Sequence, residues 1–159
     1  RAFLSLAIPN CKLLLVGPYE TEDPLQPETL KAIQQNDSIL SVGFQQDIRP
    51  YLVISDCLVF PSYREGVPNV VMQAGAMGLP SIVTDINGSN EIIIEGLNGT
   101  IVPAKNVTAL SNAMIRIKED ETWRNQLQSN ARSSIISRYE QELVWEALLI
   151  KYKHFLKVQ

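Results

Sequence analysis

The residues best suited to chemistry lie in one short stretch, "PSYREGVPNVVMQAGAMGLP", at positions 61–80. Glu65 stands beside Gly66 in a loop, and Pro68 leads into an apolar run typical of a helix. Glycine lets a backbone approach a ligand closely, and proline suits a helix start because no N–H is needed there. A carboxylate is also a strong acceptor for the hydroxyl groups of a sugar. We therefore expect this loop to bind a ligand.

The start of the helix adds a second kind of interaction. The backbone N–H groups of Asn69, Val70 and Val71 are expected to be free, and such a terminus binds phosphate or another anion. Gln73 lies one turn beyond Asn69 on the same face and offers an amide. A nucleotide sugar fits this order of groups: a hydroxyl acceptor, then an anion-binding terminus, then an amide. By spacing alone, a solvated loop glutamate and a solvated helix glutamine are the competing interpretation.

Composition limits the class of protein. The chain has 159 residues, of which 45% are hydrophobic and 19% charged, with a net charge of −3. This length supports one domain with a core, and the charge argues against a nucleic-acid partner. The apolar runs are too short to span a bilayer. Two cysteines, Cys11 and Cys57, are too few for a disulfide framework.

The chain alternates between short apolar runs and helical patterns. We expect strands at 12–16, 39–44, 57–60, 81–84 and 99–103. Helices are expected at 27–35, 47–56, 69–78, 89–96 (with Ser89 as its cap) and 106–120, followed by a helical C-terminus broken near 133–138. This alternation predicts an α/β fold, a Rossmann-like parallel sheet with helices on both faces. Ligands of such sheets bind at the carboxyl ends of the strands.

The carboxyl ends of the expected strands lie at Gly17, at Gly43 and Phe44, at 61–68 and at 84–89. The loop at 61–68 is the richest of these in small and polar residues. The topology therefore selects the same loop as the residue chemistry does.

The stretch "VFPSYREGVPNVVMQAGAMGLPSIVTDINGSNEIIIEGLNGTIVP" resembles the signature region of family 4 glycosyltransferases, which are retaining enzymes of the GT-B fold. The resemblance covers nearly the whole chain and is nearest to capsule and exopolysaccharide enzymes. It implies that residues 1–159 are a fragment, the C-terminal donor-binding domain, with the first strand and the N-terminal acceptor domain outside the sequence. The intact enzyme is expected to be cytoplasmic, with peripheral association at the inner membrane surface.

The resemblance implies a role for each matching residue. Glu65 is the catalytic candidate beside the donor sugar, and Gln73 stands where the family binds ribose with a second glutamate. Glu91 matches the Gly-x-x-Glu turn, although a helix-start carboxylate is an equally good interpretation. For Ser62, the competing interpretation is a residue that only caps or turns the loop. The remaining donor-binding candidates are Gly17, Gly43, Phe44, Gly66, Val67, Pro68, Asn69, Val70 and Val71.

The family implies a UDP- or GDP-sugar donor, a saccharide or lipid-linked acceptor, and no required metal or other cofactor. Gln73 departs from the pattern: its amide can accept one hydrogen bond and donate another, but without the strength of a charged group. We therefore expect weaker ribose binding. The basic segment that neutralises phosphate in the family lies outside this sequence. The alternatives are a nucleotide-sugar-binding module without turnover and a GT-B nucleotide-sugar epimerase.

Overall fold

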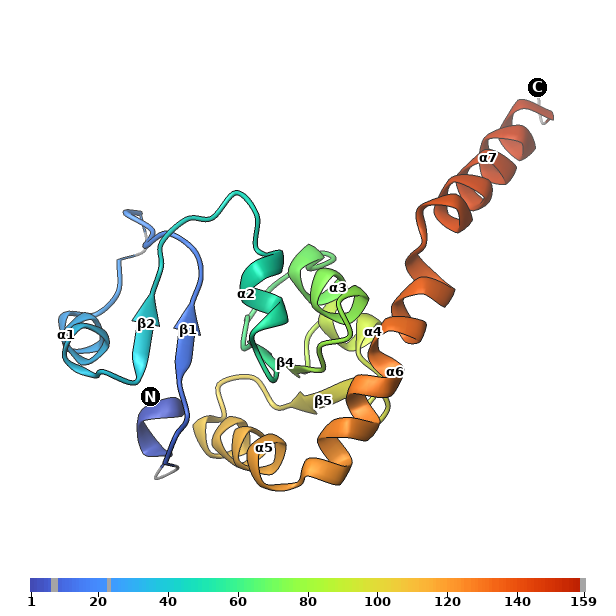
Figure 1. Ribbon diagram of the computed structural model, residues 1–159. Helices are drawn as coiled ribbons and strands as arrows, with labels where there is room; N and C mark the ends of the chain where they lie inside the picture. Colours follow the sequence, from blue (N-terminus) through green and yellow to red (C-terminus); the bar gives the residue numbers. More distant parts are fainter. Residues whose placement is uncertain (7–8, 23, 158–159) are drawn as a thin grey trace.

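The computed structural model describes residues 1–6, 9–22 and 24–157 and has the alternating order of strands and helices that the sequence predicts (Figure 1). Most of the predicted elements are present, with bounds that differ by a few residues. The elements are η1 (Phe3–Ser5), β1 (Leu13–Leu15), α1 (Pro27–Gln35), β2 (Ile39–Ser41), α2 (Arg49–Val53), β3 (Leu58–Phe60), α3 (Asn69–Ala76), β4 (Ser81–Thr84), α4 (Ser89–Ile92), β5 (Gly99–Val102), α5 (Val107–Glu119), α6 (Glu121–Tyr139) and α7 (Gln141–Lys157).

Every strand pair in the described structure is parallel, which confirms the predicted α/β class. The strands form two separate sheets, in the orders β1-β2 and β3-β4-β5. Leu13 is in register with Ile39 in the first sheet, and Ser81 with both Leu58 and Gly99 in the second. Within the described residues, β1 and β3 therefore each have one open hydrogen-bonding edge.

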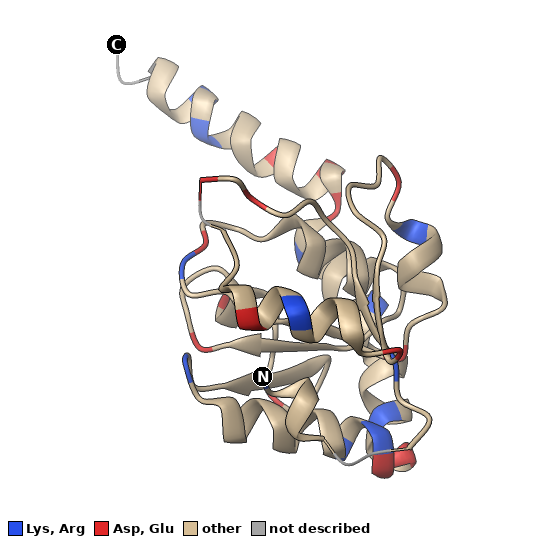
Figure 2. Ribbon diagram, turned by 90° about the vertical axis from the view of Figure 1, so that its left-hand side faces the viewer, with Lys and Arg blue, Asp and Glu red and all other residues tan. Residues whose placement is uncertain are grey.

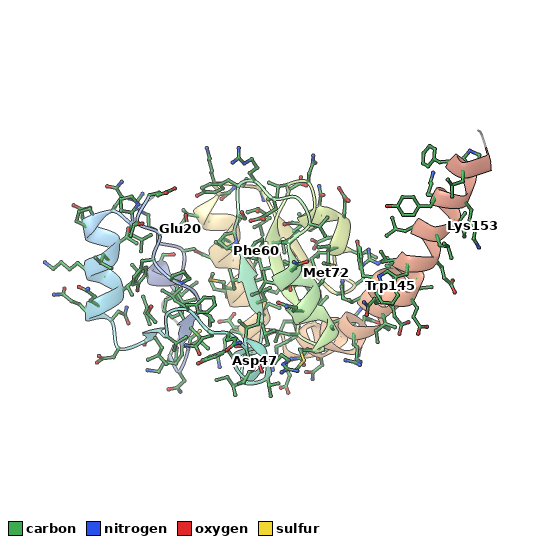
Figure 3. All side chains as sticks on the ribbon, turned by 90° about the horizontal axis from the view of Figure 1, so that it is seen from above. Glu20, Asp47, Phe60, Met72, Trp145 and Lys153 are labelled. Carbon is green, nitrogen blue, oxygen red and sulfur yellow. The ribbon has the colours of Figure 1, made fainter. Side chains whose placement is uncertain are left out.

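Helices cover both faces of the three-stranded sheet, as predicted. On one face, Val71 of α3 and Ile135 of α6 pack with Val83 of β4. On the other face, Ile117 of α5 and Leu127 of α6 pack with the adjacent strand residue Ile82. Neighbouring residues of a strand point to opposite faces, so β4 supplies both cores and is buried along its whole length. Figure 3 shows Phe60 of β3 and Met72 of α3 within this body.

The predicted break at 133–138 is wrong. Helix α6 continues through these residues, and the chain leaves the helix at Glu140, whose backbone is extended. Ile135 is buried in the core, and Arg138 donates hydrogen bonds to the carbonyls of Glu91 and Ile92. These tertiary contacts hold the last turns of α6 in place.

Helix α7 projects from the body of the domain (Figures 1 and 3). It exposes several large apolar side chains, among them Trp145, Leu149 and Phe155. None of the helices in the described part of the chain is both long enough and apolar enough to cross a membrane. Basic and acidic residues are interspersed along the ribbon, as Figure 2 shows.

Candidate donor-binding site

The acidic loop at 61–68 connects the end of β3 to the start of α3. Within it, the hydroxyl of Ser62 donates a 2.7 Å hydrogen bond to Oε1 of Glu65, and the Glu65 side chain is only half-buried. The carbonyl of Ser62 accepts a hydrogen bond from the hydroxyl of Thr84, the last residue of β4. The loop is thus tied to the central strand of the sheet, and its carboxylate keeps acceptor capacity for a ligand.

A second loop, at 85–88 after β4, packs against the acidic loop. Gly88 has a φ of +80°, and a Cβ built on it would lie 1.7 Å from the carbonyl oxygen of Gly66. Only a residue without a side chain allows this contact. The prediction that Ser89 caps α4 is wrong, because Gly88 is the residue that precedes the first helical position. Ser89 lies inside α4 with a fully buried hydroxyl. Glu91 accepts a hydrogen bond from the N–H of Gly88 at 3.4 Å, so its carboxylate serves the helix start.

The start of α3 offers fewer free donors than predicted. The N–H of Val71 donates to the carbonyl of Pro68 at 3.1 Å, because the first turn closes tightly on that residue, and the side chain of Val71 is fully buried. The prediction that the N–H of Val71 is free is therefore wrong. The N–H groups of Asn69 and Val70 have no acceptor in the described part of the chain. Two amides at the positive end of the helix dipole remain available for an anion.

Gly66 and Val67 are exposed in this loop, whereas Pro68 is buried. The exposed backbone at 66–67 therefore lies directly before the two free amides of α3. This order along the chain keeps the arrangement that the sequence suggested, a carboxylate followed by an anion-binding helix start.

Gln73 is exposed on α3 and lines a hollow together with the segment that leads into α2, namely Gln46, Asp47, Ile48 and Arg49. Arg49 donates two hydrogen bonds of 2.8 Å to Asp47. The Arg49 guanidinium holds the pKa of the Asp47 carboxyl at about 2, below its ordinary value. Arg49 is thus exposed and paired with Asp47 in the hollow that Gln73 lines.

Gly17 and Gly43 meet where β1 and β2 end. The N–H of Gly17 donates to the carbonyl of Gly43 at 2.9 Å, and both residues have positive φ angles, of 138° and 68°. Phe44 follows with 74% of its surface exposed. The predicted residues thus form two groups, one at the acidic loop and one at the ends of β1 and β2. The hollow beside Gln73 is lined by residues 46–49, which follow Phe44 along the chain, and by Gln73 itself, which follows the acidic loop. It therefore lies between segments that follow each of the two groups.

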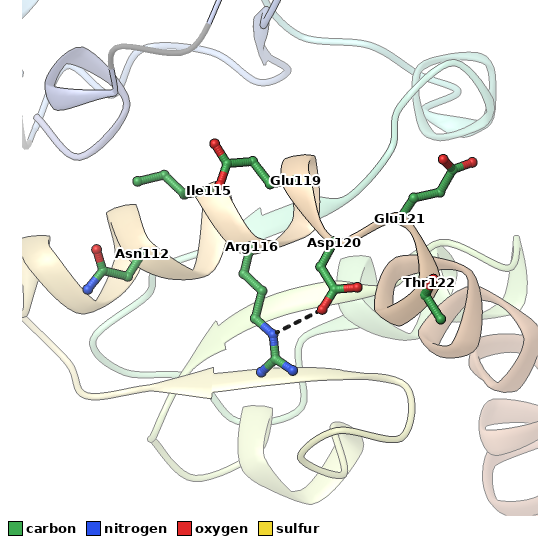
Figure 4. Close-up of a pocket in the computed structure, with 7 residues that line it drawn as sticks. All are labelled: Asn112, Ile115, Arg116, Glu119, Asp120, Glu121 and Thr122. Carbon is green, nitrogen blue, oxygen red and sulfur yellow. Dashed lines mark ion pairs between the residues drawn. The ribbon is translucent and has the colours of Figure 1, made fainter.

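A second hollow lies at the junction of α5 and α6 (Figure 4). It shares no residue with the predicted site. Its cation, Arg116, stacks on the Trp123 ring at 3.8 Å and lies 3.9 Å from a carboxylate oxygen of Asp120. Because both contacts are internal to the helix pair, this hollow is best explained by packing. Among the described residues, no group of three or more His, Cys, Asp or Glu could hold a metal ion.

The fold is a parallel α/β domain, and the acidic loop lies at the carboxyl end of a strand, which is where domains of this class bind their ligands. Residues 1–120 match the model of the family described as glycosyl transferases group 1, and the chain belongs to this family.

Individual relatives agree with this membership. The chain is 28% identical over 148 residues to the capsular polysaccharide biosynthesis glycosyltransferase CapM of Staphylococcus aureus, covering 93% of this chain and 39% of CapM. It is 29% identical over 132 residues to the UDP-Gal:alpha-D-GlcNAc-diphosphoundecaprenol alpha-1,3-galactosyltransferase of Escherichia coli, covering 83% of this chain and 34% of that protein. The sucrose-phosphate synthase of Thermosynechococcus elongatus superimposes with a TM-score of 0.82 at 27% identity, over 96% of this chain and 40% of its own. The chain therefore spans about two fifths of the proteins it matches.

Proposed function

We propose that this chain is the donor-binding part of a retaining glycosyltransferase that uses a UDP- or GDP-sugar. The acceptor is a saccharide or a lipid-linked saccharide in surface polysaccharide synthesis, reached from the cytoplasmic side of the inner membrane. The observation that carries the proposal is the acidic loop: Glu65, held by Ser62, directly precedes a helix start with two free amides. The E. coli relative, whose name specifies UDP-Gal and a diphosphoundecaprenol acceptor, supports this donor and acceptor class.

Each group has a distinct role in the proposed transfer. The amides of Asn69 and Val70 would stabilise the negative charge that develops on the leaving nucleoside diphosphate. Glu65 would accept a hydrogen bond from a hydroxyl of the donor sugar and so fix the sugar relative to the breaking bond. Gln73, beside the hollow at Asp47, would contact the ribose hydroxyls. The bond from the anomeric carbon to the diphosphate oxygen would break, a bond from that carbon to the acceptor oxygen would form, and the proton of the acceptor hydroxyl would pass to the departing diphosphate.

We also propose that the intact protein supplies a strand between β1 and β3 and a separate acceptor-binding domain. The observed orders β2-β1 and β3-β4-β5 become the order 3-2-1-4-5-6 of doubly wound folds if one strand lies between the open edges. Leu13 and Leu58 donate their N–H groups to Ser38 and Pro80, on the paired sides, so the amides of Leu14 and Val59 face the open edges. Protection of those two amides from hydrogen exchange in the full-length protein tests the inserted strand.

Calorimetric titration of the full-length protein with UDP, GDP and ADP tests the donor proposal. We expect either UDP or GDP, and not ADP, to bind with micromolar affinity. Glu65→Gln should reduce transfer from the matching sugar nucleotide by about 100-fold or more, while affinity for the nucleotide changes by less than about threefold. Absence of binding for both UDP and GDP would overturn the proposal, whether or not ADP binds.

Product analysis then separates the alternatives. Free nucleotide together with a glycoside indicates a transferase, and an epimerised sugar nucleotide indicates an epimerase. Binding with neither product indicates a module without turnover. Glu121→Gln is a suitable control for Glu65→Gln, because Glu121 lines the hollow at α5 and α6 rather than the acidic loop.

A further inference from the structure

Thr84 occupies an unusual position for a residue that is not itself a ligand candidate. It is the last residue of β4, the central strand of the three-stranded sheet, and only 2% of its surface is exposed. Its hydroxyl reaches across to a segment 22 residues earlier in the chain and donates to the carbonyl of Ser62. This hydrogen bond connects a strand of the sheet to a surface loop, and surface loops are generally more mobile than strands.

The connection continues to the acidic side chain. Ser62 uses its own hydroxyl to donate to Glu65 at 2.7 Å, and a longer contact of 3.4 Å runs to the carbonyl of Arg64. One hydroxyl has one proton, and the short bond to the carboxylate is the stronger of the two. Thr84, Ser62 and Glu65 thus form a chain of hydrogen bonds from the sheet to the carboxylate.

Such a chain reduces the number of orientations available to Glu65. A glutamate has several rotatable bonds and loses much of its side-chain conformational freedom when it is ordered. A carboxylate that is already oriented in the free protein avoids part of this loss when a ligand binds. The same carboxylate still has acceptor sites that Ser62 does not use.

We infer that Thr84 is a positioning residue: acting through Ser62, it holds Glu65 in the orientation that accepts a hydroxyl of the donor sugar. This inference rests on the proposed function of Glu65. It differs from a purely structural role of Thr84, in which the hydroxyl only satisfies a buried carbonyl. The structural role affects stability, whereas the positioning role affects the sugar-dependent step.

Strand β4 provides a matched control for this distinction. Ser81 lies at its other end, is 1% exposed, and its hydroxyl has no hydrogen-bond partner in the described part of the chain. Ser81→Ala therefore removes a buried hydroxyl from the same strand without breaking a contact to the acidic loop. Thr84→Val removes the donor and nearly preserves shape, and Thr84→Ser keeps the donor.

The experiment measures release of nucleoside diphosphate from the sugar nucleotide by the full-length protein, together with calorimetric affinity for UDP or GDP alone. We expect Thr84→Val to lower kcat by about tenfold or more, while affinity for the nucleotide stays within about twofold. Thr84→Ser should recover most of kcat, and Ser81→Ala should resemble the wild type. Ser62→Ala, which changes a loop residue, should lower kcat to a similar extent, and combining it with Thr84→Val should add little.

A wild-type kcat for folded Thr84→Val, or for Ser62→Ala, would overturn the inference. Equal loss of kcat and of nucleotide affinity in Thr84→Val would also overturn it, since a general disturbance of the site predicts that pattern. If Thr84→Val does not fold, Ser62→Ala alone decides by the same criteria. If the wild-type protein neither binds nor turns over any sugar nucleotide, the proposed function itself is overturned. That outcome is distinguishable from failure of the inference about Thr84, which requires an active wild-type protein.

Discussion

Gly88 packs so closely against Gly66 that a Cβ on residue 88 would lie 1.7 Å from the Gly66 carbonyl oxygen. This contact joins the acidic loop, which contains Glu65, to the loop that leads into α4. The first loop is also held by Thr84 through Ser62. Two independent contacts from the end of β4 therefore determine where the candidate carboxylate lies.

Replacing Gly88 should displace the acidic loop. Gly88→Ala introduces both a strained φ and a clash with Gly66, so we expect it to lower the free energy of unfolding and to weaken binding of the sugar nucleotide. Gly78→Ala is the matched control, because Gly78 also has a φ of +80° but has open space around its missing Cβ. The control should cost about 1 to 2 kcal/mol, from the left-handed backbone alone. Urea unfolding and calorimetry measure both effects, and equal losses in the two variants would contradict the prediction.

Replacing the amide at position 73 should strengthen nucleotide binding. Gln73→Glu restores a charged acceptor for ribose hydroxyls, and a charge-assisted bond exceeds a neutral one by about 1 kcal/mol, which is roughly a fivefold gain in affinity. Gln46→Glu places the same charge in the same hollow and should give no gain. The affinity of the preferred nucleotide, measured by calorimetry, checks this. Unchanged affinity in Gln73→Glu would show that Gln73 does not contact the ribose.

The Asp47 carboxyl should titrate with a pKa of about 2, because Arg49 donates to it through its side chain and its backbone. Arg49→Gln should raise the pKa of Asp47 towards its ordinary value of about 3.9 without reaching it, because the backbone N–H of residue 49 still donates to the carboxylate. Since the folded pKa is lowered, this pair stabilises the protein above about pH 4, and the contribution is lost as the pH falls towards 2. Both side chains are exposed, so the effect on stability is small. NMR titration of the carboxyl carbon measures it, with Arg64→Gln, which should leave Asp47 unchanged, as the control.

Asn98 should be important for stability. It is 1% exposed, accepts a hydrogen bond from the N–H of Ile94 at 2.7 Å, and donates to the carbonyl of Ile92 at 3.2 Å. Asn98→Ala leaves the N–H of Ile94 without its partner, which costs about 1 to 3 kcal/mol, whereas the carbonyl of Ile92 keeps its hydrogen bond from Arg138. Asn90→Ala removes an exposed side chain bonded to Asp85 and should cost less than about 0.5 kcal/mol. Chemical denaturation of the two variants checks the difference, and similar losses would be inconsistent with it.

Local signals predicted much of the fold. Strand β4 has the predicted bounds, 81–84, because four consecutive core residues follow a proline. Helix α1 has the predicted bounds, 27–35, with Pro27 at its first position and Glu28 in its first turn. The break at Glu140 was missed, since contacts of Ile135 and Arg138 with distant residues decide how far α6 extends.

The features of the candidate site were also predicted only in part from the sequence. Residue type and order along the chain identified Glu65, the glycine beside it and the helix start at Asn69. The closed first turn that occupies the N–H of Val71 follows from packing and was not predictable. The Asp47 and Arg49 pair beside Gln73 was also missed, although an acid and a base two residues apart at the start of a predicted helix were a signal that could have been used.

The sequence by itself determined which segments are strands and helices and which loop carries the chemistry, because apolar periodicity, glycine and proline act within a few residues. Only the tertiary structure decided how that loop is held. The bond from Thr84 to Ser62 and the contact of Gly88 with Gly66 each join residues 22 positions apart. Such contacts exist only once parallel strands place their carboxyl ends side by side, and no local pattern contains that information.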